Sequence, residues 1–240
     1  YCSPMKLRNY IIYIVAFLFY ACSPSYTLQS HEDKVVEIKA IEDSAVLAII
    51  APYQNAIEAE MNEVLSFTKT ELNKNGTEST LGNFVTDLCL NYTNAHMCVM
   101  NNGGLRTTIN KGEITRGKLY ELMPFENELV VLELNKDDYI GLLNYISKRG
   151  GEPFSGINIT MDKEGKILSN SWPVNFENGE KVRVLTSDYL ADGGDKMSFF
   201  QNKEKEKVGI KIRDAIIDYC SKTDTIAVSL DRRIQIIENG

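Results

Sequence analysis

A short polar segment, residues 101–106 (Asn-Asn-Gly-Gly-Leu-Arg), follows an apolar run at 97–100 and has the composition of an anion-binding turn. Asparagine and glycine tolerate left-handed backbone angles, which predicts a tight turn here. The backbone amides of such a turn, beside the guanidinium of Arg106, would bind an anion. A hairpin turn that ends in a surface arginine accounts for the same residues equally well. The segment alone does not decide between the two interpretations.

Three more side chains at predicted turns have the chemistry to recognise a nucleotide. Phe125 follows a proline, Tyr189 lies at the end of a predicted strand, and Asp195 follows a second glycine turn. Aromatic faces stack on bases, a carboxylate accepts hydrogen bonds from sugar hydroxyls, and arginine binds phosphate. Each residue also has a plainer explanation, since most single aromatic residues pack in a core and aspartate often stabilises a turn. Together with residues 101–106 they predict a nucleotide site.

Groups that would cleave a bond are scarce in the chain. Its only histidines are His31 and His96, whereas a two-metal phosphatase site needs a cluster of Asp, His and Asn ligands. The sequence contains no Walker-type glycine loop, G-x-S-x-G turn or C-x-x-C pair. We interpret His96 as structural, and Cys89, Cys98 and Cys220 as small buried residues. The sequence thus predicts recognition chemistry, with no catalytic residue, metal or cofactor held by this chain.

Helical and extended patterns alternate along the chain, which favours an α+β fold of mixed β-sheets with packed helices. Apolar residues at helical spacing predict helices over 44–67 with a break at Pro52, over 79–92, and over 206–221. Residues 112–125 are predicted to form a short helix that leads into Pro124 and Phe125, and Asn135 with Asp138 is typical of the start of another. Strands are predicted at 97–100, 128–134, 155–162, 166–171, 181–187 and 225–237.

The N-terminal segment is typical of an export signal. Lys6 and Arg8 precede an apolar run at 10–20 that is too short to span a bilayer comfortably. The run ends at Ala21-Cys22, which is similar to a bacterial lipobox and predicts lipidation of Cys22; an ordinary secretory signal is the alternative. We therefore expect a signal peptide at 1–22, a tether at 23–40 and a domain at 41–240. The protein would be a bacterial envelope lipoprotein, either periplasmic or at the cell surface.

Composition narrows the class of protein. The chain has 240 residues, of which 43% are hydrophobic, enough for one sizeable domain or two small ones. Its net charge is −7 and its pI is about 5.1, which argues against nucleic acid as a partner.

Five motifs in order resemble the C-terminal domain of the 5'-nucleotidase family, which includes ecto-5'-nucleotidases and periplasmic UDP-sugar hydrolases. They are LGNFVTD (81–87), NNGGLR (101–106), GEITRGKLYELMPFEN (112–127), FSGINI (154–159) and TSDYLADGGD (186–195). The resemblance covers roughly residues 41–238. It implies a domain that holds the nucleotide, next to a separate metallophosphatase domain that carries two metals and a catalytic Asp–His pair.

The resemblance also implies roles for six residues. Phe125 and Tyr189 would stack on the base, and Asn101 and Arg106 would contact the substrate. Asn127 belongs to the same motif as Phe125, and Asp195 would bind the ribose.

The sequence departs from the family pattern at several positions. Asn102 replaces a glycine, and this change is tolerable because asparagine can adopt a positive φ. Glu126 replaces another glycine and brings a negative charge near the expected base site, and Tyr189 stands where phenylalanine is usual. A further substrate-binding arginine, expected shortly before residue 81, is missing, and Lys74 is the candidate substitute. The metallophosphatase domain is also missing from the 240 residues.

Three hypotheses follow. In the first, the chain is the nucleotide-recognition half of a 5'-nucleotidase-type phosphohydrolase in nucleotide catabolism, and a separately encoded metallophosphatase chain supplies the divalent metals. In the second, it is a non-catalytic lipoprotein that binds nucleosides or nucleotides. In the third, it is a structural or interaction domain that keeps the fold but not the site. We favour the first.

Overall fold

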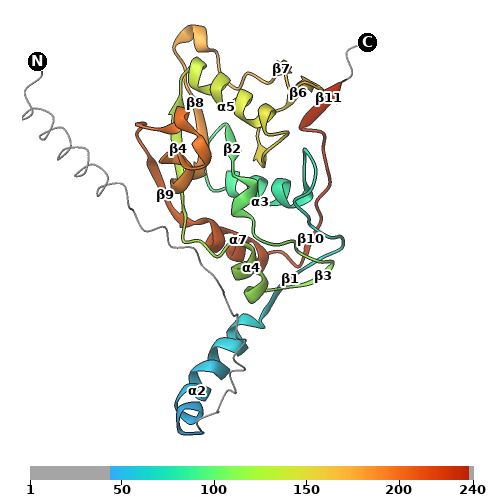
Figure 1. Cartoon of the computed structure of the whole chain (residues 1–240), viewed down its shortest axis with the longest axis vertical. Helices are drawn as coiled ribbons and strands as arrows, with labels where there is room; N and C mark the ends of the chain where they lie inside the picture. Colours follow the sequence, from blue (N-terminus) through green and yellow to red (C-terminus); the bar gives the residue numbers. More distant parts are fainter. Residues whose placement is uncertain (1–43, 238–240) are drawn as a thin grey trace, which may run out of the picture. The chain divides into compact units, whose positions relative to one another are not determined.

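The computed structural model describes residues 44–237 of the chain (Figure 1). The predicted signal peptide (1–22), the lipidated Cys22 and the tether (23–40) lie outside these described residues, so they stay predictions. Within the described part of the chain, no helix is both long and apolar enough to cross a membrane.

Helices and strands alternate along the described residues, with short 3-10 turns between them. The α-helices are α2 (Ser44–Met61), α3 (Thr80–Leu90), α4 (Arg116–Leu122), α5 (Lys136–Lys148), α6 (Asp188–Ala191) and α7 (Ile212–Ser221). The strands are β1 (Val64–Thr68), β2 (Met97–Val99), β3 (Gly112–Thr115), β4 (Glu128–Leu134), β5 (Phe154–Ser155), β6 (Ile159–Asp162), β7 (Ile167–Asn170), β8 (Val182–Ser187), β9 (Glu206–Lys211), β10 (Thr225–Ile226) and β11 (Ile234–Ile237). The 3-10 turns are η1 (Asn102–Gly104), η2 (Phe176–Asn178), η3 (Gly194–Lys196) and η4 (Ser198–Phe200).

A five-stranded sheet with the order β5-β2-β8-β4-β9 forms the centre of the fold. Strands β2 and β8 run parallel, while the other neighbouring pairs are antiparallel. Two three-stranded sheets, β10-β1-β3 and β11-β6-β7, each combine one parallel and one antiparallel pairing. This mixture of sheets with packed helices confirms the predicted α+β class.

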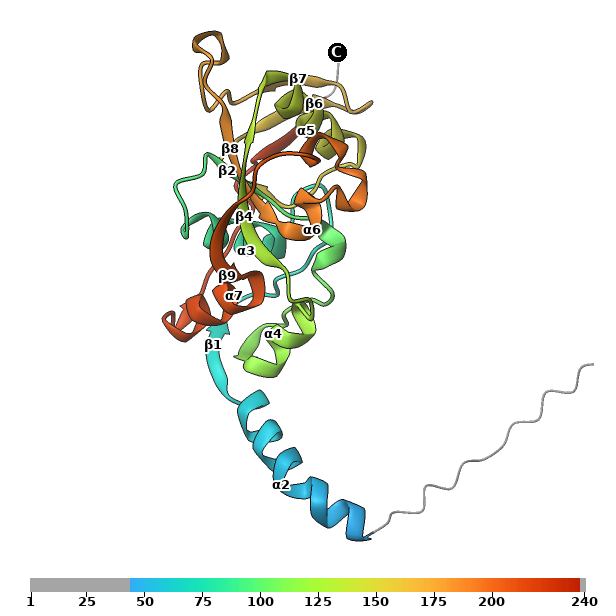
Figure 2. The same ribbon diagram turned by 90° about the vertical axis from the view of Figure 1, so that its left-hand side faces the viewer.

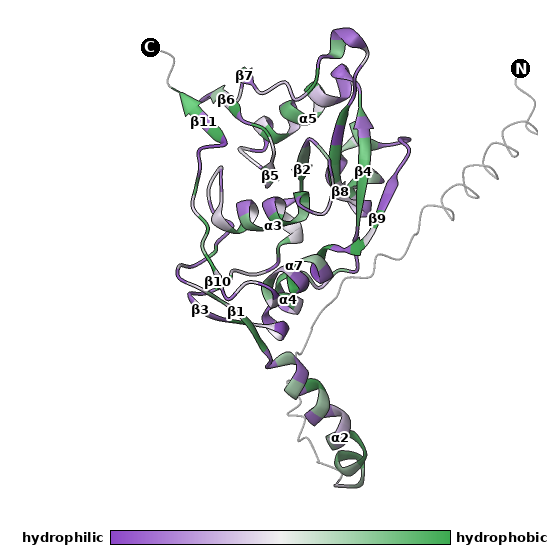
Figure 3. Ribbon diagram, turned by 180° about the vertical axis from the view of Figure 1, so that it is seen from behind, coloured by the Kyte–Doolittle hydropathy of each residue, from purple (hydrophilic) through white to green (hydrophobic). Residues whose placement is uncertain are grey.

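Both faces of the central sheet are covered by apolar side chains. In β4, Leu129 and Val131 pack with the core under α3, α4 and α7, whereas Val130 and Leu132 pack with the core under α5 and α6. Because successive side chains of a strand point to opposite faces, a strand buried on both sides reads as a continuous apolar run. Figure 2 shows the sheet nearly edge-on, and Figure 3 shows apolar stretches on β2 and β4.

The predicted helix starts at Ser79 and Asn135 are confirmed by their caps. The Ser79 hydroxyl accepts a hydrogen bond from the Gly82 amide at 3.1 Å. The Asn135 side chain likewise accepts one from the Asp138 amide at 2.9 Å. Each cap satisfies an amide that has no partner inside its helix, and this local pairing is readable from sequence.

Three predicted helices are shorter than expected, because a strand occupies part of each range. The range 44–67 ends as a helix at Met61 and continues as β1, which pairs with β3 and β10. The range 112–125 begins with β3 before α4, and the range 206–221 begins with β9 before α7. Pairing with a neighbouring strand decides these segments, and that pairing is a tertiary effect which helical spacing does not report.

The predicted break at Pro52 is also wrong, since Pro52 lies inside the 18-residue helix α2. Proline removes one intrahelical hydrogen bond. No residue of α2 is buried, so a carbonyl group without an intrahelical partner faces water, where it is hydrated.

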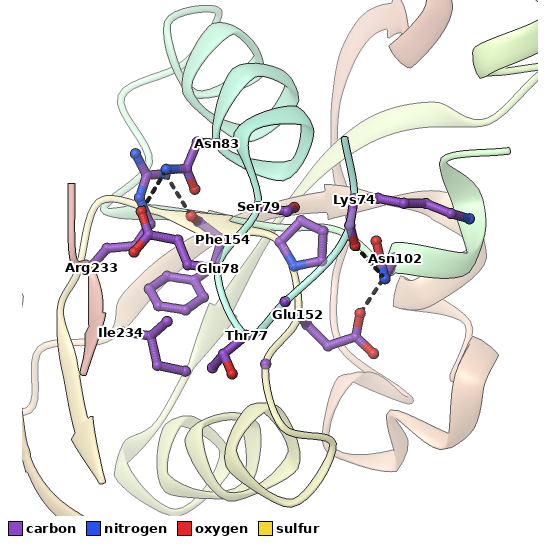
Figure 4. A pocket seen from close by; sticks show the side chains of 13 residues that line it. Lys74, Thr77, Glu78, Ser79, Asn83, Asn102, Glu152, Phe154, Arg233 and Ile234 are labelled. Atoms are coloured by element: carbon purple, nitrogen blue, oxygen red, sulfur yellow. Dashed lines mark hydrogen bonds between the residues drawn. The ribbon is translucent and has the colours of Figure 1, made fainter. Parts of the chain in front are cut away.

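A buried arginine ties the C-terminal strand to the rest of the fold. The Arg233 guanidinium donates to both carboxylate oxygens of Asp87, at 2.8 and 2.9 Å, and to the carboxylate of Asp231. It also donates to the carbonyl of Phe154 at 2.8 Å. Two carboxylates and a carbonyl thus pair a charge that would be costly to bury alone. Figure 4 shows Arg233 and Phe154 in the pocket that they help to line.

The same pocket lies where the segment 149–153, after α5, packs against the segment 74–79, before α3. Gly151 has a φ of +113°, and a Cβ added to it would lie 2.1 Å from the carbonyl oxygen of Thr77. Only glycine fits this approach, so Gly151 fixes how closely the two segments pack.

We predict that Gly151→Ala destabilises the fold more than Gly150→Ala. Gly150 also has a positive φ, +71°, but a Cβ there meets no atom within 4 Å. The backbone strain of Gly150→Ala should cost about 1–2 kcal/mol, and the clash in Gly151→Ala should add roughly 1–3 kcal/mol. Urea denaturation of both variants measures the free energies of unfolding. Equal losses would show that the segment 149–153 is free to move away from Thr77.

Candidate functional site

One cleft of about 350 Å³ collects all six residues that the sequence singles out for substrate binding. Its volume lies within the usual range of small-molecule sites. The cleft is lined by Asn101, Gly103, Gly104, Arg106, Phe125, Asn127, Tyr189 and Asp195. The structure brings these residues together from segments far apart in sequence, although their role as substrate contacts stays a prediction.

Strand directions explain why the segments meet. β2 and β8 run parallel, so their carboxyl ends lie at the same edge of the central sheet. Asn101 follows β2, and Tyr189 follows β8. β4 is antiparallel to β8, so its amino end lies at this edge too, with Phe125 and Asn127 just before it. The segments next to these three neighbouring strands therefore form the cleft at one edge of the sheet.

The sequence predicts left-handed backbone angles in the first glycine turn, residues 101–104 (the asparagine turn), but the structure shows none there. Residues 102–104 form the 3-10 turn η1, and none of the four residues has a positive φ. Gly104 leaves space for the Asn101 side chain, because a Cβ there would lie 2.8 Å from the Asn101 Oδ1 atom and would displace it. Positive φ is therefore not the reason that Asn102 is tolerated.

Arg106 leaves this turn toward the aromatic side of the cleft. Its guanidinium donates to the Gly103 carbonyl at 3.2 Å and lies 5.9 Å from the centre of the Phe125 ring. Such a cation–π contact holds the arginine beside the ring, where both groups line the cleft. A positive charge and an aromatic face are thus adjacent, which suits an aromatic anion.

The second glycine turn, residues 193–196 (the aspartate turn), places a carboxylate between the two turns. The Asp195 Oδ2 atom accepts from the Asn101 side-chain amide at 2.7 Å. Its Oδ1 atom accepts from the Tyr189 hydroxyl at 2.9 Å. A Cβ added to Gly194 would lie 2.6 Å from the Tyr189 ring, so glycine lets the ring lie against this turn. The carboxylate is therefore oriented by protein groups before any ligand arrives.

Phe125 and Tyr189 are surface residues, 44% and 45% exposed. The plainer interpretation of both as core residues is therefore wrong. Exposed aromatic faces in a cleft are available to stack on a planar ring.

Glu126 lies outside the residues that line the cleft, and its charge is paired. Its carboxylate accepts from Lys211 and from the buried guanidinium of Arg213. These hydrogen bonds, the one to Lys211 first, lower the pKa of Glu126 to about 2. The negative charge that the sequence places near the base site is therefore offset by two cations that come from β9 and α7.

Lys74 does not line the cleft. Its amine donates to the Leu105 carbonyl at 2.8 Å and so supports the backbone between the asparagine turn and Arg106. The idea that Lys74 replaces the missing arginine as a substrate contact has no support in this geometry.

The structural roles expected for His96 and the cysteines are confirmed. His96 Nδ1 accepts from the Arg183 backbone amide at 2.9 Å. Cys89, Cys98 and Cys220 are buried and unpaired with one another, and burial raises the pKa of Cys89 to about 12. Among residues 44–237, no group of three or more His, Cys, Asp or Glu side chains is arranged to hold a metal. The described residues do not fit a two-metal centre.

A family model described as "5'-nucleotidase, C-terminal domain" matches residues 57–202, more than half of the chain. The chain belongs to this family. The resemblance seen in the five sequence motifs is thereby confirmed.

Relatives of this 5'-nucleotidase C-terminal domain include proteins named as an apyrase, a nucleotide phosphoesterase and 5'-nucleotidases. An apyrase of Tabanus yao is 25% identical over 78% of the chain, and the trifunctional nucleotide phosphoesterase YfkN of Bacillus subtilis is 31% identical over 62%. The crystal structure of a 5'-nucleotidase precursor from Thermus thermophilus matches 82% of the chain with a TM-score of 0.67 and 26% identity.

The matched relatives are longer than this chain. The match spans 40% of the apyrase, 12% of YfkN and 44% of the Thermus thermophilus protein. The 5'-nucleotidase C-terminal domain therefore corresponds to only part of each of them.

We predict that Glu126→Gln lowers stability near neutral pH but not in strong acid. A carboxyl group whose pKa is depressed on folding stabilises the fold above its unfolded pKa, and this contribution is lost as the pH falls through the folded pKa. The difference between wild type and variant should therefore shrink as the pH falls from about 4.5 to about 2.

Denaturant unfolding across this pH range measures the effect. Glu121→Gln, which breaks one surface pair with Lys118, reports the effect of losing a surface carboxylate together with a single exposed ion pair. A pH-independent difference between wild type and Glu126→Gln would contradict the ion-pair geometry around Arg213.

Proposed function

We propose that this chain is the nucleotide-recognition part of a 5'-nucleotidase-type phosphohydrolase. The observation that carries the proposal is the cleft, in which an arginine, two exposed aromatic rings and an oriented carboxylate lie together. A nucleotide offers a complementary part to each of them: a phosphate, a planar base and a hydroxylated sugar. Membership of the 5'-nucleotidase C-terminal domain family supports the same class of ligand.

Within this proposal, each group of the cleft has a part. Phe125 and Tyr189 bind the base through their exposed faces, and the Asp195 carboxylate accepts hydrogen bonds from ribose hydroxyls. Arg106 and Asn101 bind polar groups nearer the phosphate, and Asn127 completes the edge of the cleft beside Phe125. These residues bind and orient the nucleotide and carry out no bond cleavage.

Cleavage requires groups that residues 44–237 do not provide, since they hold no cluster suited to metal ions. We propose that a metallophosphatase encoded on a separate chain binds the divalent metals and acts on the nucleotide held here. The names of the relatives, an apyrase and a nucleotide phosphoesterase among them, are consistent with hydrolysis of nucleotides by the combined unit. Export and a lipid anchor at Cys22 would place this unit in the cell envelope.

We predict that the cleft variants separate base recognition from phosphate recognition. Phe125→Ala and Tyr189→Ala should each weaken the binding of both AMP and adenosine by about tenfold or more, since stacking on an aromatic ring contributes roughly 1–3 kcal/mol. Arg106→Ala should weaken the binding of AMP by about tenfold to a hundredfold, because it removes a charge-assisted contact, and should leave the affinity for adenosine unchanged. Isothermal titration calorimetry measures all the affinities.

Tyr53→Ala is the control for the loss of an exposed aromatic residue, since Tyr53 lies on α2 and outside the cleft. Unchanged affinity in both aromatic variants would rule out stacking in this cleft. Loss of adenosine binding in Arg106→Ala would rule out a phosphate-specific role for the arginine. Absence of binding to AMP, adenosine and UDP-sugars at millimolar concentration would favour a structural or interaction domain.

We predict that the purified chain alone does not hydrolyse AMP with added divalent metals, and that activity appears when a metallophosphatase chain from the same genome is added. Phosphate release measures both conditions, and Arg106→Ala should lower the reconstituted rate. Efficient hydrolysis by the pure chain would overturn the division of labour. Binding without activity in any mixture would favour the alternative, a lipoprotein that captures nucleosides or nucleotides without cleaving them.

A further inference from the structure

Three side chains connect the asparagine turn to the aspartate turn: Tyr145 on α5, and Arg149 and Glu152 in the segment just after it. The Tyr145 hydroxyl donates to the backbone carbonyl of Asp195 at 2.9 Å. Arg149, four residues along, lies 5.4 Å from the centre of the Tyr145 ring and is ion-paired with Glu152. Glu152 then accepts from the backbone amide of Asn102 at 2.7 Å, a contact shown in Figure 4.

These contacts close into a ring. The Asp195 side chain accepts from the Asn101 side-chain amide at 2.7 Å, and Asn101 is bonded directly to Asn102. The two turns are thus joined twice: once directly, by the hydrogen bond between Asp195 and Asn101, and once through the contacts of Tyr145, Arg149 and Glu152. A displacement of either turn must break a contact in this ring.

The aspartate turn needs support of this kind. Asp195 has a φ of +50° and Lys196 a φ of +68°, so two consecutive non-glycine residues are left-handed. Such angles are costly for side chains other than glycine and persist where neighbouring groups hold them. The Tyr145 hydroxyl holds the carbonyl of the first of these residues. Burial raises the pKa of Tyr145, so its hydroxyl stays a proton donor at neutral pH.

Glu152 is suited to hold the other turn. Its side chain is 1% exposed, and a buried carboxylate is tolerated when it is paired and hydrogen-bonded. Arg149 supplies the opposite charge, and the Asn102 amide supplies a hydrogen bond. Removing either partner would leave the buried Glu152 charge less compensated, so both contacts are favoured in the folded state.

We propose that Tyr145, Arg149 and Glu152 (the α5 network) are positioning residues that set the placement of the Asp195 carboxylate relative to the asparagine turn. None of the three lines the cleft, so they act on a ligand through Asp195, Asn101 and Arg106. The effect on ligand affinity rests on the proposed function, whereas the effect on the two turns does not.

The test compares Tyr145→Phe with Tyr139→Phe. Both tyrosines lie on α5, and each donates a hydroxyl hydrogen bond to a backbone carbonyl, Tyr139 to that of Ser171 at 2.8 Å. Amide hydrogen exchange should become faster in residues 193–196 of Tyr145→Phe by roughly threefold to tenfold, the effect of one lost hydrogen bond, and remain at the wild-type rate in Tyr139→Phe. The Kd for AMP, from calorimetry, should rise by a similar factor in Tyr145→Phe alone.

Glu152→Gln tests whether the ring transmits a change from one turn to the other. The amide side chain keeps an oxygen for the Asn102 amide but loses the ion pair with Arg149. Exchange should become faster in residues 101–104 and also in residues 193–196, and a purely local packing role of Glu152 would change only the first.

The possible results separate the two proposals. If exchange in both turns of Tyr145→Phe matches that of Tyr139→Phe, the α5 network has no positioning role. If wild type binds no nucleotide but Tyr145→Phe still exchanges faster at the aspartate turn, the network is supported and the proposed function fails. If Tyr145→Phe exchanges faster yet binds AMP as tightly as wild type, the part of the proposal that concerns the ligand is overturned.

Discussion

The parallel pairing of β2 with β8 is the constraint on which the rest of the structure depends. Because both strands end at the same edge, the asparagine turn and the aspartate turn emerge side by side. The antiparallel strand β4 begins at this edge and brings the aromatic segment before it into the same place. Reversing any one of these three strands would carry its turn to the opposite edge of the sheet. Apolar side chains on both faces of the sheet hold these strands between two cores.

The cleft is held together mainly by a shared carboxylate. Asp195 accepts hydrogen bonds from Asn101 on the asparagine turn and from Tyr189 on α6. Orientation by protein groups means that little ordering remains to be done when a ligand binds, which favours affinity. The hydroxyl of Tyr189 helps to orient the Asp195 carboxylate. A phenylalanine at this position would offer the same ring but leave one carboxylate oxygen without this partner.

Local features of the fold could be predicted from the sequence, and features set by distant partners could not. The caps at Ser79 and Asn135 and the apolar run of β4 depend on neighbours in sequence. By contrast, the residues of β9 join a helical pattern that predicts a helix, yet pairing with β4 decides their structure. The family motifs indicate the residues that line the cleft, because these residues form short, recognisable segments. Nothing local indicates that Glu126 pairs with Lys211 and Arg213, about 85 residues away, or that the Tyr145 hydroxyl reaches Asp195.

The burial of the cysteines has a consequence for the chemical durability of the protein. The thiolate is the form of cysteine that reacts with oxidants and disulfides. Burial raises the pKa of the Cys89 thiol to about 12, so the reactive thiolate form is strongly disfavoured at neutral pH. Cys98 lies in the same apolar core, and burial raises its pKa as well. In the folded state these thiols are therefore poor substrates for disulfide exchange, and an oxidising environment would threaten them chiefly before the core has formed.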